Sequence, residues 1–390
     1  MTVAERTEIV ATIRDWVERE VMPVASELEH ADEYPERLVE QMKELGLFGV
    51  IISEEHGGLG LDLTTYALIQ VELSRGWMSL SGVLNTHFLS AWMIETYGTE
   101  EQRQRYLPKM AAGELHSAYS MTEPHAGSDV QAIRTLALRE GDEYAITGQK
   151  MWATNGLRAG MVMLLAKTDP DASPPHRGMT AFILEKTPGR SEQPGLTIPP
   201  PLRKLGYKGV ESTELVFDRF RTPASSVLGG EAGIGQGFKY FMGAIELGRV
   251  NIAARAVGIA TRAFEEAIRY AQERHAFGKA IAQHQMIQEK IADMGTKLEA
   301  AKLMLLQAAK KKSEGGRSDL EAGMAKYFCT EVCHQIVTEA LRVHGGYGYS
   351  AEYPIERLYR DAPLLLIGEG TSEIQKLVIS RQLLERYKLT

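Results

Sequence analysis

The chain has 390 residues, of which 24% are charged and 44% apolar, a composition typical of a soluble globular protein with two or three domains. Its formal net charge is −7 and no lysine–arginine cluster offers a stripe that could follow a phosphate backbone, which argues against a nucleic-acid binder. The first sixteen residues predict an acidic amphipathic helix instead of a signal peptide, and no apolar run of membrane-spanning length follows. We therefore expect a cytoplasmic protein that binds neither nucleic acid nor a membrane.

Residues 1–115 predict an N-terminal helical domain. Apolar residues recur at steps of three and four along the first helix, which places them on one face. They are Val10, Ile13, Val17, Val21 and Val24. A second helix is expected after Pro35, and further helical patterns cover about 62–75, 80–97 and 100–112.

Residues 116–232 predict a central β-barrel-like domain. Turn clusters at 168–178 and 187–195 separate short apolar or alternating runs, as in a compact all-β domain. The runs are 116–121, 132–138, 143–152, 161–167, 179–184 and 212–217.

The helical period returns in residues 233–390, which predict a C-terminal four-helix bundle. The expected helices are 237–274, one whose apolar seam starts at Ile287, 318–343, and one after Glu369. The fold class is therefore α+β multidomain, with the β domain between two helical domains.

Glu369 stands out because it lies between Gly368 and Gly370 just before the last helix, after the apolar run 364–367. Ser372 and Gln375 have the spacing of a capping box. A carboxylate against apolar surface is desolvated, which raises its pKa and makes it a better proton acceptor near neutral pH. Taken alone, this pattern favours an ordinary solvated loop glutamate before a helix.

Four other stretches carry features that a fold alone does not require. The segment 119–129 leaves a strand with hydroxyls and exposed loop amides, which suit a polar ring edge. In 150–156, Trp152 and Thr154 are two residues apart on a strand, so one could cover a flat ring while the other binds its edge. RHAFG (274–278) and RVHGGYG (342–348) pair a cation with glycines, as a diphosphate site needs. Each also has an ordinary explanation as core, strand or turn.

The order and spacing of TEPHAGSD, KMWATNG, RHAFGKAIAQHQ, HGGYGY, YRDA and EGTSEIQ resemble the acyl-CoA dehydrogenase family of flavoproteins. The similarity covers essentially the whole chain, and the family has the same helical, β, helical order. The resemblance implies a homotetramer that binds FAD between the β domain and the bundle. It also implies an acyl-CoA substrate and transfer of electrons to an electron-transferring flavoprotein.

The resemblance also implies roles for individual residues, with no metal ligand among them. The residues that match FAD-binding positions are Tyr119, Met121, Thr122, Ser128, Trp152, Thr154, Arg274, Phe277, Gln285, Arg342, Gly345, Gly346, Thr371 and Glu373. Those that match substrate-binding positions are Ser128, Arg249, Gly368 and Gly370. Glu369 matches the catalytic base, which would take the α-proton while the β-hydrogen leaves as hydride to flavin N5, giving a trans-2-enoyl-CoA.

Four features bear on the substrate and the site. Some family members carry the base on the long helix, where this chain has Gly248, so Glu369 is the one candidate. Gly368 stands where straight-chain members often have tyrosine, which favours a branched short or medium acyl group. Arg342 replaces a usual glutamine and would bind diphosphate or form a local ion pair. No lysine or arginine occurs between Trp77 and Gln102, on the helix that lines the acyl pocket, which argues against a dicarboxylic acyl group.

Other functions are compatible with parts of the sequence. The same fold could serve an acyl-CoA oxidase, a flavin monooxygenase or a non-catalytic binding subunit. A helical-bundle di-iron protein is the alternative of another class, because Glu27 and His30, and Glu331 and His334, both have the Glu-x-x-His spacing. Those two pairs lie in different expected domains.

Overall fold

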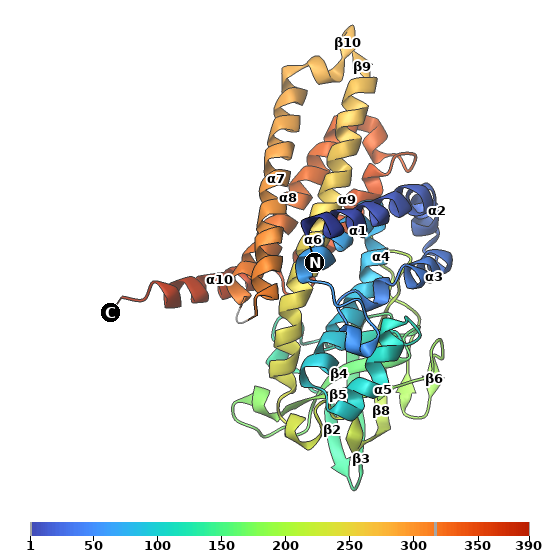
Figure 1. The fold of residues 1–390 in the computed structure, drawn as a ribbon, viewed down its shortest axis with the longest axis vertical. Helices are drawn as coiled ribbons and strands as arrows, with labels where there is room; N and C mark the ends of the chain where they lie inside the picture. The colour runs from blue at the N-terminus through green and yellow to red at the C-terminus, as the bar shows by residue number, and fades with distance from the viewer. Residues whose placement is uncertain (1, 316–317, 390) are drawn as a thin grey trace.

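The computed structural model describes residues 2–315 and 318–389. Helical segments precede and follow the sheet in sequence, and the sheet lies at one end of the molecule, at the bottom of Figure 1. The N-terminal helices are α1 (Val3–Trp16), a π-helical turn (Val17–Val21), α2 (Met22–Ala31) and α3 (Glu36–Glu44). Thr2 starts α1 with a capping box to Glu5. The predicted apolar face is confirmed at the π-helical turn, where Val17 and Val21 are fully buried.

Helix α4 (Leu63–Tyr97) runs through the centre of the molecule and is buried over most of its length. Trp77 inside it has non-helical dihedral angles, φ −158° and ψ 114°, so the two helices expected from the sequence meet at a kink there. Asp62 caps its start by accepting a hydrogen bond from the Thr65 amide. Helix α5 (Glu100–Ala111) follows after a capping box at Thr99.

The sheet contains a strand in each of the short apolar or alternating runs from which strands were predicted. Its strands are β1 (Ser117–Ser120), β2 (Leu136–Glu140), β3 (Glu143–Thr154), β4 (Met161–Lys167), β5 (Met179–Glu185), β6 (Glu192–Gln193), β7 (Leu196–Thr197) and β8 (Ser212–Pro223). Their order is β1-β4-β2-β3-β8-β7-β6, and β5 pairs with β4 off this path. The β3–β8 ladder is antiparallel, with Lys150 opposite Leu215, and its register shifts between Lys150 and Ala153.

The C-terminal part is built on three long helices that lie side by side in Figure 1. They are α6 (Gly237–Glu273), α7 (Gln285–Ser313) and α8 (Asp319–His344), and the short strands β9 (His275–Ala276) and β10 (Lys279–Ala280) form the hairpin between α6 and α7. Helix α10 (Ser372–Arg386) packs on α8 at its start and then projects away from the bundle (Figure 1). The expected α+β fold class is confirmed.

One further helix was not expected from the sequence. Helix α9 (Ile355–Ile367) packs on α8 and α6, and the apolar run before Glu369 is its last turn. Pro363 within the helix and Gly368 at its end obscure the helical pattern. Among the helices of residues 2–315 and 318–389, none is long and apolar enough to cross a membrane.

Candidate active site

Glu369 lies in the turn between α9 and α10, where its carboxylate meets two other helices. Asn85 of α4 donates a hydrogen bond from Nδ2 to Glu369 Oε1 at 3.1 Å. On α6, Gly248 faces the same carboxylate, because a Cβ placed there would lie 2.8 Å from Glu369 Oε2. Glu369 itself adopts a left-handed conformation, φ +54°, which is rare outside glycine and occurs often at functional sites.

The N-cap of α10, which fixes the turn around Glu369, is a different residue from the one predicted. Thr371, and not Ser372, is the N-cap, and its Oγ1 accepts a hydrogen bond from the Ile374 amide at 3.3 Å. Ser372 is therefore the first helical residue, and the predicted capping box is wrong. The Gln375 side chain instead donates to the backbone oxygens of Glu369 and Gly370 at 3.3 and 3.1 Å. Gln375 thus holds the strained backbone in place.

The environment raises the pKa of the Glu369 carboxyl, and burial is the main cause. The hydrogen bond from Asn85 opposes that shift, followed by the positive charges of Arg255, Arg249 and Lys326. Lys326 is itself fully buried, where desolvation lowers its pKa to about 8, and its Nζ donates to the Leu366 carbonyl at the end of α9. Glu369 as a whole is half-buried, and the part removed from water is its carboxylate, which contacts Asn85 and faces Gly248.

Trp152 and Thr154 lie at the end of β3, where a register shift turns the strand. Trp152 has φ +63° and exposes 53% of its surface, whereas Ala153 beside it is buried. Thr154 is half-buried. The two residues flank a buried neighbour, but the register shift and the positive φ of Trp152 interrupt the regular alternation from which they were expected to share one side. The exposed indole of Trp152 offers an aromatic face to a flat ring.

A buried ion pair supports the segment that runs from Tyr119 at the end of β1 into the loop with Met121, Thr122 and the exposed Ser128. Lys150 Nζ donates to Glu123 Oε1 and to the Met121 carbonyl, both at 2.9 Å. Glu123 also accepts from the amides of Arg134 and Thr135 at 2.7 and 3.0 Å. This pair was not predicted, although a lysine two residues before Trp152 in a strand and a glutamate in TEPHAGSD were its visible signals.

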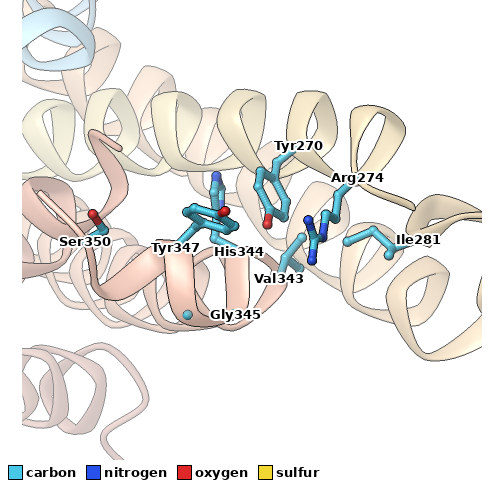
Figure 2. Close-up of a pocket in the computed structure, with 9 residues that line it drawn as sticks. Tyr270, Arg274, Ile281, Val343, His344, Gly345, Tyr347 and Ser350 are labelled. Carbon is cyan, nitrogen blue, oxygen red and sulfur yellow. The ribbon is translucent and has the colours of Figure 1, made fainter. Parts of the chain in front are cut away.

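The bundle carries a cavity of about 590 Å³ between α6 and the end of α8 (Figure 2). Arg274 and the two predicted glycines, Gly345 and Gly346, line it. A Cβ at either glycine would have no atom within 4 Å, so the backbone there is open to a ligand. A cation beside open backbone suits the diphosphate and adenine of a dinucleotide. These residues therefore fit FAD.

The structure does not bring all predicted FAD residues together within one chain. The β9–β10 hairpin beside Arg274 lies at the opposite end of the bundle from the sheet that carries Trp152 (Figure 1). Phe277 next to the hairpin is 95% exposed, and Gln285 is exposed at the start of α7. Arg342 pairs with Glu339 at 2.5 Å, which is the local ion pair considered in the sequence analysis.

The remaining predicted residues lie near Glu369. Arg249 is half-buried on α6 beside Gly248, and its Nε makes no hydrogen bond among the residues described. Thr371 is half-buried, while Glu373 points into solvent on α10. Gly368 precedes Glu369 with an ordinary extended backbone, φ −63° and ψ 151°.

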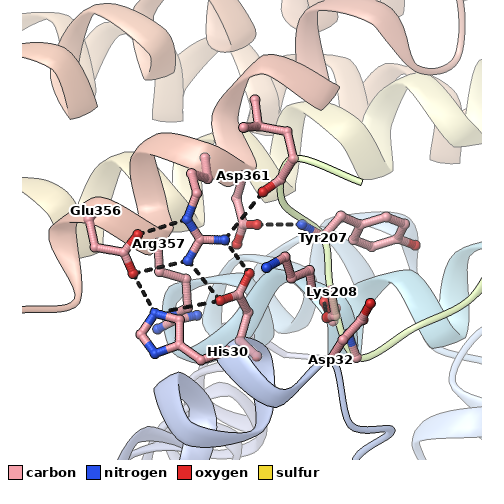
Figure 3. A network of polar contacts seen from close by, with 12 residues as sticks. His30, Asp32, Tyr207, Lys208, Glu356, Arg357 and Asp361 are labelled. Carbon is pink, nitrogen blue, oxygen red and sulfur yellow. Dashed lines mark hydrogen bonds and ion pairs between the residues drawn. The ribbon is translucent and has the colours of Figure 1, made fainter. Parts of the chain in front are cut away.

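A polar network ties α9 to the N-terminal helices and was not predicted from YRDA. Arg360 binds both oxygens of the buried Glu29 at 2.6 and 2.8 Å. His30 Nε2 lies 2.6 Å from Glu356 Oε1 (Figure 3). Asp361 accepts a hydrogen bond from the Tyr207 amide at 2.6 Å (Figure 3). The network fixes the helix that leads into Glu369.

The network also bears on the di-iron alternative. His30, half of one Glu-x-x-His pair, contacts Glu356 of α9. Among residues 2–315 and 318–389, no three histidine, cysteine, aspartate or glutamate side chains gather as metal ligands would. No observation on these side chains favours a di-iron centre.

Three family models match the chain consecutively. They are the acyl-CoA dehydrogenase N-terminal domain at residues 4–114, the middle domain at 118–220 and the C-terminal domain at 235–384. An acyl-CoA dehydrogenase of Bacillus subtilis is 40% identical over 373 residues, covering 95% of this chain and 96% of that protein. A 3-(aryl)acrylate reductase of Clostridium sporogenes is 39% identical and covers 99% and 100% of the two chains. The structure of butyryl-CoA dehydrogenase from Megasphaera elsdenii is similar, with a TM-score of 0.93, 35% identity and coverage of 98% and 99%.

Proposed function

The chain belongs to the acyl-CoA dehydrogenase family and is an oxidoreductase, and we propose that Glu369 is the base that removes the α-proton of an acyl-CoA. The observation that carries this proposal is a desolvated carboxylate, wedged between α4 and α6, with no side chain at the facing Gly248. Its raised pKa suits proton abstraction near neutral pH. Anaerobic addition of acyl-CoAs to the holoenzyme tests the proposal.

The family is FAD-dependent, and FAD when bound supplies the acceptor for the β-hydrogen. In this proposal Trp152 and Thr154 hold the flavin ring, together with Tyr119, Met121 and Thr122 on the loop supported by Lys150. Arg274, Gly345 and Gly346 hold the diphosphate and adenine of a second copy's FAD, because they line the cavity beside the β9–β10 hairpin, and that hairpin is at the opposite end of the bundle from the sheet (Figure 1). The bound flavin ring and the residues that hold it would exclude water from the reacting carbons. Exclusion of water strengthens the electrostatic interaction between the Glu369 carboxylate and the α-proton.

Exposed apolar side chains in the C-terminal part suggest that the chain assembles with further copies of itself. Phe277, Met286, Leu377, and Leu384 are exposed apolar residues of the C-terminal part. Contiguous exposed apolar patches mark contact sites with partners, and Leu377 and Leu384 lie seven residues apart on one face of the projecting helix α10. We propose a homotetramer that passes its electrons to an electron-transferring flavoprotein.

Gly368 gives a testable statement about the acyl group. A Cβ there would meet only the Leu364 oxygen at 3.4 Å and Ile252 Cδ1 at 3.9 Å, so the position has room for a side chain. We expect Gly368→Tyr to fill that space and lower the ratio of kcat/KM for 2-methyl over straight-chain acyl-CoAs by about tenfold or more. Gly368→Ala is the matched control and should change the ratio far less. An unchanged ratio in the tyrosine variant would contradict the branched-chain proposal.

The pH dependence of turnover should report the environment of Glu369. The carboxylate form is the active base, so turnover falls as pH drops through its pKa. Asn85 donates to that form, and Asn85→Leu removes a contact that lowers the pKa. We expect the acid limb of the kcat–pH profile to move to higher pH. Stopped-flow measurements between pH 5 and 9 check this, and an unmoved limb with normal FAD content would refute it.

A further inference from the structure

Arg255 on α6 is a buried cation without an acidic partner. It is 2% exposed, and no carboxylate of residues 2–315 and 318–389 forms an ion pair with it. Its Nε donates to Asn251 Oδ1 at 2.7 Å and its Nη2 to the Ser81 carbonyl at 3.3 Å. Buried charges in proteins are normally paired, since transfer of an unpaired charge from water is costly. An arginine in this state is a candidate anion site.

The guanidinium still has hydrogen atoms to donate. Arginine carries five N–H donors in a planar fork, and the hydrogen bonds to Asn251 and Ser81 use two of them. Its Nη1 makes no hydrogen bond with any residue in the described part of the chain. The remaining donors match the two oxygens of a carboxylate, which arginine binds in a fork-to-fork arrangement.

The two helices that meet the Glu369 carboxylate, α4 and α6, also position Arg255, which lies on α6 and contacts α4. Their geometry sets the distance between Arg255 and Glu369. On α4, Asn85 binds the Glu369 carboxylate and Ser81, one turn earlier, binds Arg255. One turn of four residues corresponds to about 6 Å along the helix. On α6, Gly248 and Arg255 are seven residues apart and share one face. The positive charge of Arg255 also lowers the pKa of Glu369, as expected for a near neighbour.

The wall beside Arg255 is fixed by contacts from three other elements. The Tyr207 ring lies with its centroid 5.6 Å from the guanidinium carbon, a cation–π distance. A Cβ at Gly82 of α4 would lie 2.0 Å from the Tyr207 hydroxyl, so only glycine leaves space for this ring. The Tyr207 amide is held by Asp361 of α9 (Figure 3). The Arg255 side chain is therefore held in one position by Asn251, Ser81 and Tyr207.

We propose that Arg255 binds an anionic group, in the simplest case a carboxylate, at the far end of a short acyl chain whose reacting carbons lie at Glu369. This inference rests on the proposed function, because it takes Glu369 as the base. It revises the argument from α4, which considered cations on that helix alone. The cation comes from α6 instead, and the short spacing favours diacid chains of roughly five or six carbons.

The test compares matched acyl-CoAs on the holoenzyme of the full chain. Flavin bleaching and steady-state rates would be measured with glutaryl-CoA against pentanoyl-CoA, and with adipyl-CoA against hexanoyl-CoA. We expect the carboxylated member of at least one pair to have the higher kcat/KM. Arg255→Gln should lower that preference by about tenfold to a hundredfold, mainly through KM, as expected for loss of a charge-assisted hydrogen bond. Exposed Arg269 on the same helix provides the control variant Arg269→Gln, which should keep the preference.

The outcomes separate the two proposals. If pentanoyl-CoA and hexanoyl-CoA bleach the flavin better than both diacid esters, the role of Arg255 is refuted while the dehydrogenase function stands. If Arg255→Gln lowers kcat/KM equally for both members of a pair, Arg255 is structural and the inference fails. If no acyl-CoA of either kind bleaches the flavin, the proposed function itself fails. Thermal unfolding of each variant confirms that the comparison is made between folded proteins.

Discussion

Glu369→Gln is expected to lower kcat by about 10²–10⁴-fold, the usual contribution of a positioned general base. Glutamine has nearly the same shape and can still contact Asn85, so the turn between α9 and α10 should keep its structure. FAD content and affinity for acyl-CoA should therefore stay close to those of the unchanged protein. Stopped-flow reduction of the flavin under anaerobic conditions measures the chemical step directly.

A matched control guards against a general effect of charge removal. Glu385 lies on the same helix, α10, and is exposed at its far end. Glu385→Gln removes the same charge at a distance from the site and should leave flavin reduction unchanged. Reduction of the Glu369→Gln variant at nearly the normal rate would remove Glu369 from the base role. Because Gly248 has no side chain, α6 offers no replacement base at that position.

Lys150→Met should be the most destabilising single change discussed for this protein. Lys150 is fully buried, and its removal leaves Glu123, 3% exposed, without its cationic partner. Breaking one side of a buried ion pair costs about 3–5 kcal/mol. Burial lowers the pKa of Lys150 to about 8, so the amine is still largely charged at pH 7. Urea denaturation should show the loss in the free energy of unfolding.

The same variant should also bind FAD less tightly. Lys150 Nζ holds the Met121 carbonyl, and the Met151 amide donates to the Thr122 carbonyl at 2.9 Å. Loss of the lysine therefore loosens the loop beside Trp152. Lys239→Met, at an exposed position on α6, is the control and should change neither property. The double variant Glu123→Gln with Lys150→Met should be more stable than Lys150→Met alone, since no buried charge is left unpaired. Equal stability of the two would argue against the ion pair as the cause.

Much of the fold could be predicted from local patterns. The three-and-four spacing of the helices, the alternation on β3 and β8, and the continuous apolar runs of β4 and β5 depend only on which faces of each element are buried. The special position of Glu369 was also visible, because its flanking glycines and apolar approach are adjacent in sequence. Helix α9 was missed because its apolar positions are interrupted by Pro363 and joined to polar YRDA.

The partners of Glu369 could not be predicted in the same way, since they come from distant elements. Asn85 is one of many buried polar residues on α4, and the packing of α4 against the Glu369 turn gives its side chain a partner. Arg255 lies on α6, so an argument from the charges of α4 could not find it. The cap was assigned one residue late, because Thr371 and Ser372 both have the side chain of an N-cap.

The most direct test of the account is anaerobic titration of the yellow holoenzyme with a panel of acyl-CoAs, followed in the visible flavin spectrum. The panel would hold straight, 2-methyl, 3-methyl and ω-carboxylated chains. We predict that at least one of them bleaches the flavin in the unchanged protein and that the same ester leaves Glu369→Gln largely unbleached. A flavin that no acyl-CoA bleaches, or that bleaches equally fast without Glu369, would contradict the assignment of Glu369 as the base of an acyl-CoA dehydrogenase.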